Sequence, residues 1–279
     1  MPHSDKSHRN RPQRNASWKV VGVMLAHHRK RALLTQEQLA ERVYCDGESI
    51  ASVEQGRRAL SVKLAVLIDE ALGTHGAMRT AAEAIPRRER YPAFAREYME
   101  HEEEALSLLW YENAAVPGLL QTPEYAEAVF SNFYPPLPAD QIAQQTEDRI
   151  ARQALFHRKP QPPVMHFVIE EHVLMRPIGG PEVMRGQLRH LRQMTELPFV
   201  GIQIIRTERE THAGLAGPMI LVETPDHEQL GYLEGQHVSF LQDDPDEVHL
   251  LHLKYGMLRS QALPLEDSKR LLDELLGES

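Results

Sequence analysis

The sequence predicts an α+β protein of two parts, in which an all-α domain is followed by a larger domain with a small sheet covered by helices. Residues 18–72 carry helical periodicity and helix caps but no strand pattern. From residue 164 onward, short runs rich in β-branched and other apolar residues are separated or followed by helical segments. The sign of the charge also changes near residue 90, which divides the chain in the same place.

Successive helices are expected in the first part. The first helix has Val21, Leu25 and Ala32 on one face. Thr35 and Gln38 have the spacing of a capping box at the start of the second. Asp46 and Gly56 are expected to bound the third helix, and Ser61 and Gly73 the fourth. The inner faces of the second and third helices are expected to be formed by Leu39, Ala40, Val43, Ile50 and Val53.

Residues 74–93 are expected to form an irregular joint, because Pro86 and Pro92 flank the charged run 87–90. Beyond it, helices are expected at 94–113, 123–132, 139–157, 181–195, 245–262 and 264–276, and strands at 164–170, 200–206, 219–224 and 230–235. These patterns divide the chain into a flexible basic arm (1–16), a first domain (17–80), a linker (81–94) and an α+β domain (95–279).

The charge of the chain is unevenly distributed. Residues 1–90 contain 16 Lys and Arg against 10 Asp and Glu, whereas residues 91–279 contain 15 against 30. A basic first third joined to an acidic remainder indicates a polyanion-binding domain with a non-binding partner domain, unless the imbalance arose by chance. No apolar run is long enough to cross a membrane, and the polar N-terminus lacks the apolar core of a secretory signal. The single cysteine, Cys45, fits a reducing cytoplasm.

Residues 35–56 have the spacing of two short helices joined by a tight turn, which is the geometry of a helix-turn-helix. The pattern extends over residues 20–73 and resembles the Cro-type, phage-repressor (XRE) helix-turn-helix family; the alternative is an unrelated helical bundle. The matching positions are Thr35, Gln36, Leu39, Ala40, Val43, Ser49, Ile50, Glu54, Gly56 and Arg58. The resemblance implies a protein that binds double-stranded DNA.

The same resemblance implies which residues meet DNA. Gln36 would contact a phosphate or a base, and Gly47, Glu48, Ser49 and Ser52 would face the groove. Gln55, Arg57 and Arg58 would hold the far backbone. Because this third helix begins without Lys or Arg, most of the affinity is expected from flanking basic residues: Arg9, Arg11, Arg14, Lys19, Arg29, Lys30, Arg31, Arg57 and Arg58.

Two positions depart from the family pattern. The family has glycine in the turn between the two helices and just before the Leu that precedes the capping Thr, and this chain has Tyr44 and Leu33 there. If the backbone keeps a positive φ at these positions, each side chain costs on the order of 1 kcal/mol.

Motifs in the acidic part resemble the uncharacterised C-terminal domain that follows the same DNA-binding module in many actinomycete regulators. They occur at residues 111–130, 149–153, 170–180, 187–191, 232–235 and 262–275. The resemblance implies a transcription regulator whose acidic domain receives a signal from a small ligand or from a small protein encoded nearby. The alternative is an antitoxin-like interaction protein that sequesters such a partner and regulates its own operon. Because one helix-turn-helix reads only a half-site and the first domain offers little spare apolar surface, we expect a homodimer joined mainly through the acidic domain.

Other chemistry is weakly represented. Glu170, Glu171 and Glu234 lie at expected strand ends, but no nucleophile with a neighbouring base accompanies them, so we expect no enzymatic activity. His249 and His252 have metal-ligand spacing beside Glu247, but with 15 histidines such pairs arise by chance. No phosphate-binding glycine loop or zinc-type cysteine set is present, so no cofactor and no metal are expected. Cys45 lies inside the helix-turn-helix and is either inert packing or a redox sensor.

Overall fold

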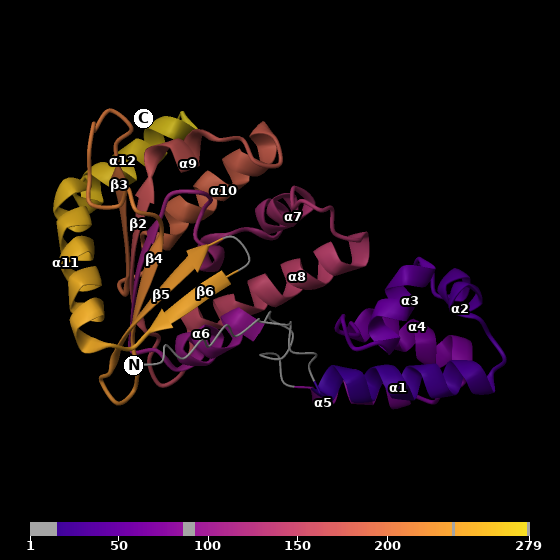
Figure 1. Ribbon diagram of the computed structural model, residues 1–279. Helices are drawn as coiled ribbons and strands as arrows, with labels where there is room; N and C mark the ends of the chain where they lie inside the picture. The colour runs from indigo at the N-terminus through magenta and orange to yellow at the C-terminus, as the bar shows by residue number, and fades with distance from the viewer. Residues whose placement is uncertain (1–15, 86–92, 236–237, 278–279) are drawn as a thin grey trace, which may run out of the picture. The chain divides into compact units, whose positions relative to one another are not determined.

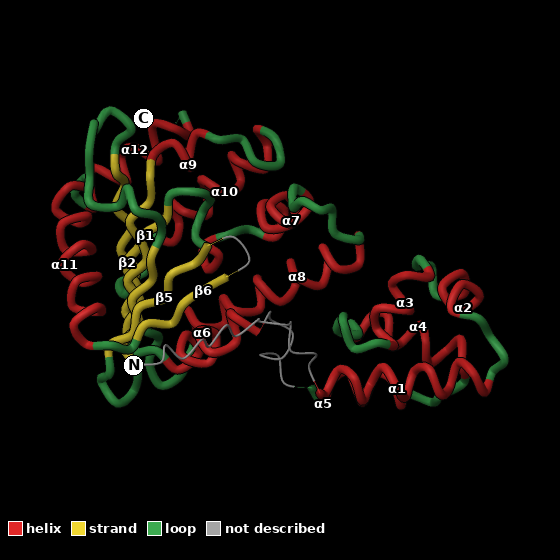
Figure 2. Tube along the Cα trace, in the orientation of Figure 1, coloured by secondary structure: helices red, strands yellow, loops and turns green. Residues whose placement is uncertain are grey.

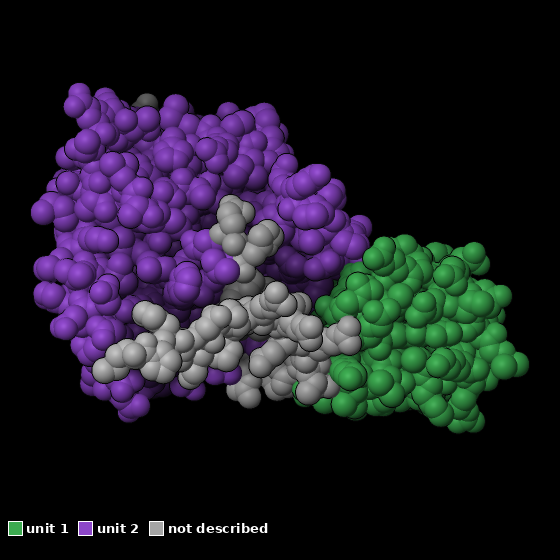
Figure 3. Space-filling view, viewed as in Figure 1, with its two compact units in different colours: residues 1–93 green, residues 94–279 purple. Residues whose placement is uncertain are grey.

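The computed structural model describes residues 16–85, 93–235 and 238–277. The chain folds as two compact units, residues 1–93 and residues 94–279 (Figure 3). The described residues of the first unit form one hydrophobic core, which contains Trp18, and those of the second form two, one on each face of its sheet, of which one contains Trp110.

The described residues of the first unit are helical (Figure 1). The helices are α1 (Ala16–Arg31), α2 (Gln36–Arg42), α3 (Gly47–Glu54), α4 (Val62–Leu72) and α5 (Ala77–Ala84). Leu25, Leu39, Ile50 and Ile68 are fully buried in a single core, which joins α1 to α4. The expected inner faces of the second and third helices are thus confirmed, whereas Ala32 lies beyond the end of α1 and is exposed.

The helix caps lie where their chemistry predicts them. Thr35 and Gln38 form both hydrogen bonds of a capping box, and the carboxylate of Asp46 accepts from the backbone N–H of Ser49. Ser61 caps α4, and Gly73 ends it with a left-handed backbone.

The first unit continues beyond the expected end of its fourth helix. Residues 74–93 do not form an irregular joint throughout, because α5 occupies part of this segment; residues 86–92 lie outside the described residues. The carboxylate of Asp69 on α4 accepts hydrogen bonds from the backbone N–H groups of Met78 and Arg79 at 2.9 Å each, and from the hydroxyl of Thr74. Burial alone would raise the pKa of Asp69, but these hydrogen bonds outweigh it and lower the pKa. A buried carboxylate of α4 thus caps the start of α5.

Leu33 and Tyr44 both adopt the left-handed backbone that the family pattern assigns to glycine. Their φ angles are 56° and 57°, and both side chains are 90% exposed. The side chains therefore gain little packing within this unit while their Cβ atoms strain the backbone.

The second unit is built around a six-stranded sheet in the order β3-β2-β1-β4-β5-β6 (Figures 1 and 2). The strands are β1 (Ser107–Glu112), β2 (Val164–Glu170), β3 (Val200–Ile205), β4 (Met219–Glu223), β5 (Gln229–Gly235) and β6 (Val238–Gln242). β1, β2 and β3 are parallel, whereas β4, β5 and β6 continue from β1 as antiparallel neighbours.

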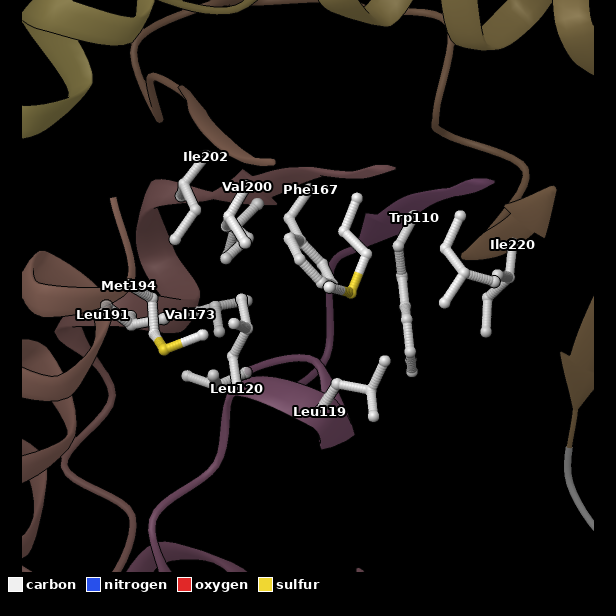
Figure 4. Close-up of a cluster of buried hydrophobic side chains, with 14 of the residues drawn as sticks. Trp110, Leu119, Leu120, Phe167, Val173, Leu191, Met194, Val200, Ile202 and Ile220 are labelled. Atoms are coloured by element: carbon white, nitrogen blue, oxygen red, sulfur yellow. The ribbon is translucent and has the colours of Figure 1, made fainter. Parts of the chain in front are cut away.

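Helices cover both faces of this sheet. On one face, Trp110, Phe167 and Ile220 point toward the short 3₁₀ turn Gly118–Leu120 and α10 (Figure 4). This core also includes side chains of α7, α9 and α12. On the other face, Tyr111, Val168 and other strand residues pack against α11. The helices of this unit are α6 (Ala93–Glu104), α7 (Pro123–Ser131), α8 (Ala139–Ala151), α9 (Glu171–Met175), α10 (Pro181–Met194), α11 (Pro245–Gln261) and α12 (Leu265–Leu276), with a second 3₁₀ segment at Arg152–His157.

The α+β fold is confirmed, but the first helix and the first strand of the second unit were predicted wrongly. Residues 94–113 are not one helix, since α6 ends at Glu104 and β1 follows, so residues 164–170 are not the first strand. β1 is a central strand with Leu108 and Trp110 buried on one face and Tyr111 on the other. A short strand buried on both faces has no alternating pattern and looks like a buried helix. β6 and α9 were not expected either.

No helix among the described residues has both the length and the apolar character that a membrane crossing requires.

Replacing Tyr44 with glycine should stabilise the first unit by about 1 kcal/mol, because glycine adopts a positive φ without strain. Tyr44→Ala is the matched control: it removes the same exposed ring but keeps the Cβ. Hydrogen exchange of peptides from residues 16–85 in the full chain measures the difference. Equal protection in the two variants would show that the ring, not the backbone, sets the stability at this turn.

Candidate nucleic-acid interface

The two helices α2 and α3 pack against each other through buried apolar side chains. Ala40 on α2 and Ile50 on α3 are at most 2% exposed, and the connection between the helices passes through the left-handed Tyr44. Asp46 begins α3, and its hydrogen bond from the Ser49 N–H, 2.6 Å long, lowers the pKa of its carboxyl. The acidic start of α3 is thus a cap.

A buried ion pair fixes the other end of α3. Arg29 at the end of α1 binds Glu54 in a bidentate arrangement, with Nε–Oε1 and Nη2–Oε2 distances of 2.6 and 2.9 Å. The two side chains are 10% and 7% exposed. The hydrogen bond to Glu54 is the main cause of the raised pKa of Arg29. The pair therefore ties α1 to the last turn of α3.

The same carboxylate also holds the start of α2. Gln36 Nε2 donates to Glu54 Oε2 at 2.7 Å, and Arg29 Nη1 donates to the carbonyl oxygen of Leu34 at 2.7 Å. Arg29, Leu34, Gln36 and Glu54 form one network, which we call the Arg29–Glu54 clamp. It connects α1, the loop after it, α2 and α3. The sequence pattern marks Glu54 but gives no indication that its partner lies 25 residues earlier.

Close backbone contact adds to the clamp. A Cβ built on Gly22 of α1 would lie 2.3 Å from the carbonyl oxygen of Val53, and one on Gly56 would lie 2.7 Å from the Cα of Lys19. Only glycine fits at either position, so α1 lies directly against the end of α3. The sequence signal for this contact is a glycine in the middle of a helix pattern, and Gly22 was not among the predicted site residues.

The structure corrects two of the expected DNA contacts. Ser49 is 2% exposed and does not face a groove: its hydroxyl donates to Asp46 Oδ2 at 2.9 Å and accepts from Arg58 Nη1 at 2.8 Å. Arg29 is 8% exposed and is held in the clamp, so it is not one of the basic residues available to DNA. In both cases, hydrogen-bond partners within the first unit hold the polar side chain inward.

The remaining expected contacts lie at or near the surface. Glu48, Gln55 and Arg57 are exposed, whereas Gln36, Gly47, Ser52 and Arg58 are partly buried. Arg57 Nε donates to Gln55 Oε1 at 3.0 Å, which groups these two side chains just after α3. Lys19, Lys30 and Arg31 are also exposed, and Arg9, Arg11 and Arg14 lie outside the described residues.

The strand-end carboxylates of the second unit are engaged in structural hydrogen bonds. Glu170 Oε1 accepts from the hydroxyl of Tyr111 at 2.7 Å and lies 2.9 Å from His212 Nε2. Burial, followed by this hydrogen bond, raises the pKa of Tyr111. Glu171 Oε2 accepts from the backbone N–H of Thr207 at 2.7 Å. Glu234, by contrast, is exposed. Glu170 and Glu171 therefore each have hydrogen-bond partners of their own, whereas Glu234 lies at the surface.

The structure gives no sign of a metal site at His249 and His252, and it places Cys45 at the edge of a core. His249 is exposed and His252 is partly buried, and burial lowers the pKa of His252. Within the described ranges, no three His, Cys, Asp or Glu side chains come together as metal ligands would. Cys45 is partly buried and packs against the core of the first unit.

Comparison with known families agrees with this geometry. Residues 20–82 match the family model described as "Helix-turn-helix domain". This match supports a DNA-binding regulator. Residues 95–274 match the model described as "Domain of unknown function (DUF5753)", and the chain belongs to that family. No curated protein and no solved structure matches the chain.

Removing the Glu54 carboxylate from the clamp should lower the free energy of unfolding of the first unit. Glu54→Ala leaves Arg29 buried without an anion and is expected to cost about 3–5 kcal/mol, whereas replacing both residues with apolar ones should restore most of the stability. Glu41→Ala, which removes an exposed carboxylate from α2, is the control and should cost about 0.5 kcal/mol or less. Protection of residues 16–85 from hydrogen exchange measures the stability of the Glu54→Ala variant, of the double variant and of the control. A Glu54→Ala variant as stable as the Glu41 control would rule out the clamp as the main tie between α1 and α3.

Proposed function

We propose that the protein is a sequence-specific transcription regulator of the Cro-type (XRE) group, in which α3 reads DNA and the second unit receives a signal. The observation that carries this proposal is the asymmetry of α3. Its inner side is buried through Ile50 and Val53, and its end is held by the clamp, whereas Glu48 and Gln55 are exposed. A short helix with a fixed inner side and a free polar outer side is what base reading in a groove requires.

Base contacts and phosphate contacts are assigned to different side chains. Glu48 accepts from a cytosine amino group, and Ser52 pairs with either type of base. Arg57, with Gln55 beside it, binds the phosphate backbone just beyond α3. Gln36 is oriented by its hydrogen bond to Glu54, and Gly47 lets the backbone approach. Arg58 supports the start of α3 through Ser49 and lies beside Arg57 at the backbone.

The second unit is proposed as the receiver. Its own cores make it a separate folding unit, and residues 91–279 carry an excess of 15 acidic side chains, which disfavours contact with DNA. The signal is a small ligand or a small protein encoded nearby. One helix-turn-helix reads only a half-site, so the protein acts as a dimer, joined through this unit, on two half-sites about one helical turn apart.

The phosphate contact of Arg57 is tested on two kinds of DNA duplex. Enriched duplexes are those that the full-length chain selects from a random pool, and random duplexes are the unselected pool. Arg57→Ala should weaken binding to enriched and random duplexes alike, and should lower the slope of log affinity against log salt by about 1, because one phosphate contact is lost. Arg185→Ala removes an exposed arginine from α10 and should leave both affinities unchanged. If Arg57→Ala behaved like this control, the far backbone contact would lie elsewhere.

The base contacts of Ser52 and Glu48 are tested by comparing the affinity of each variant for the enriched and the random duplexes. Ser52→Ala should cost about 1–3 kcal/mol on the enriched duplex and leave random DNA unchanged. Glu48→Ala should likewise weaken only the enriched duplex, while random DNA binds equally or more tightly, because a carboxylate near phosphates is repelled. Equal losses on both duplexes would remove Ser52 from the reading set. Tighter binding of the enriched duplex by Glu48→Ala would mean that this acid limits affinity and contacts no base.

A further inference from the structure

Tyr44 combines a strained backbone with an exposed ring. Its φ angle is 57°, and its side chain is 90% exposed. A positive φ is unfavourable for any residue that has a Cβ, and the exposed ring has no buried contacts to offset this strain. Within the described part of the chain, its hydroxyl has no hydrogen-bond partner. Neither packing nor hydrogen bonding inside the first unit therefore accounts for a tyrosine at this position.

The residues on either side of Tyr44 are fixed. Val43 is 2% exposed, and Cys45 packs against the same core. The backbone N–H of Cys45 donates to the carbonyl oxygen of Ala40 at 3.0 Å. Tyr44 is thus held outward between two anchored neighbours. A tyrosine side chain has only two rotatable bonds, so a contact made from such a position loses little conformational entropy.

The turn places Tyr44 next to the start of α3. Asp46 caps this helix, and Gly47 is its first residue. The chain from Tyr44 to Gly47 spans at most about 11 Å. The major groove of DNA is about 12 Å wide and is bordered by the two phosphate backbones. When α3 enters a groove as proposed, Tyr44 therefore lies within one groove width of the point of entry.

The charged side chains around the start of α3 are acidic. Asp46 and Glu48 belong to it, and Glu37 of α2 is so close that a Cβ built on Gly47 would lie 3.4 Å from Glu37 Cγ. Residues 43–49 contain no Lys or Arg. A cation here would pair with these carboxylates, whereas a phenol is neutral and donates a hydrogen bond from the far end of its ring. The length of the ring also keeps a bound phosphate away from the carboxylates.

We propose that the hydroxyl of Tyr44 donates a hydrogen bond to a DNA phosphate beside the start of α3. Tyrosine is among the side chains that contact DNA phosphates, and such contacts position a protein on the duplex without reading its sequence. The inference rests on the proposed function and adds a phosphate contact at the opposite end of α3 from Arg57. The hydrogen bond offsets the strain at Tyr44 only when DNA is bound, so the free protein retains the full strain.

The contact is tested by comparing full-length variants on the enriched and the random duplexes. Tyr44→Phe removes only the hydroxyl and keeps both the ring and the strained backbone. It should weaken binding to both kinds of duplex about tenfold or more, because a hydrogen bond to a charged group is lost. Tyr44→Ala and Tyr44→Gly should weaken both to a similar extent.

The salt dependence of binding separates this contact from the contact of Arg57. A neutral hydroxyl displaces no counterion from a phosphate, so the slope of log affinity against log salt should be the same for Tyr44→Phe and for the wild-type chain. Arg57→Ala, by contrast, is expected to lower the slope by about 1. A lowered slope for Tyr44→Phe would mean that cationic contacts have moved, and it would overturn the direct contact of the hydroxyl.

Stability separates a contact with DNA from a structural role. Tyr44→Gly should protect residues 16–85 from hydrogen exchange better than the wild-type chain does, because glycine relieves the strain, and yet it should bind DNA more weakly. A residue with only a structural role would change stability and affinity in the same direction. Leu33→Gly is the matched control, because Leu33 has a φ of 56° and 90% exposure but no hydrogen-bonding group. This control should also gain protection, and its affinity for DNA should stay at the wild-type value.

Other results overturn the proposal. Wild-type affinity in Tyr44→Phe together with weaker binding by Tyr44→Ala would mean that the ring, and not the hydroxyl, contacts DNA. Wild-type affinity in the Phe, Ala and Gly variants would exclude Tyr44 from the interface. Both results leave the proposed function standing, because the wild-type chain still binds its enriched duplexes. Failure of the wild-type chain to enrich any duplex would instead count against the proposed function, and the inference would fail with it.

Discussion

The buried ion pair between Arg29 and Glu54 is the interaction on which the first unit depends. A single carboxylate orients an arginine from α1 and a glutamine from α2 while ending α3. Because both charges are desolvated, neither tolerates loss of the other, and the pair specifies one arrangement of the three helices. Every outward residue of α3 takes its position from this arrangement.

α3 contains no Lys or Arg, and charged side chains at its two ends have structural roles. An arginine that looks suited to a phosphate is used for internal structure, and an acid that looks misplaced at the start of α3 is a cap. What remains outside is a small polar surface with Glu48, Ser52 and Arg57. In the proposed function, such a surface would discriminate between sequences through a few contacts, while the general attraction to DNA would come from basic residues around it.

The sequence-based predictions were accurate where a feature depends on residues close in sequence, and less accurate where it depends on residues far apart in the chain. Caps at Thr35 and Ser61 depend on neighbours three residues away, so they were located correctly. The inward turn of Ser49 depends on Arg58 and on the crossing of the helices, which no local pattern contains. β1 was predicted as helix because burial on both faces of a sheet removes the alternation that identifies a strand. The positive φ of Tyr44 was anticipated from the family pattern alone.

The two tryptophans divide between the two units, with Trp18 in the core of the first and Trp110 in a core of the second. Replacing either one with phenylalanine would leave a chain whose indole fluorescence arises from one unit only. The chain therefore contains an optical reporter in each half. A ligand or protein that binds the second unit and changes the emission of Trp18 would reveal communication between the halves, on the time scale of a mixing experiment and without any label.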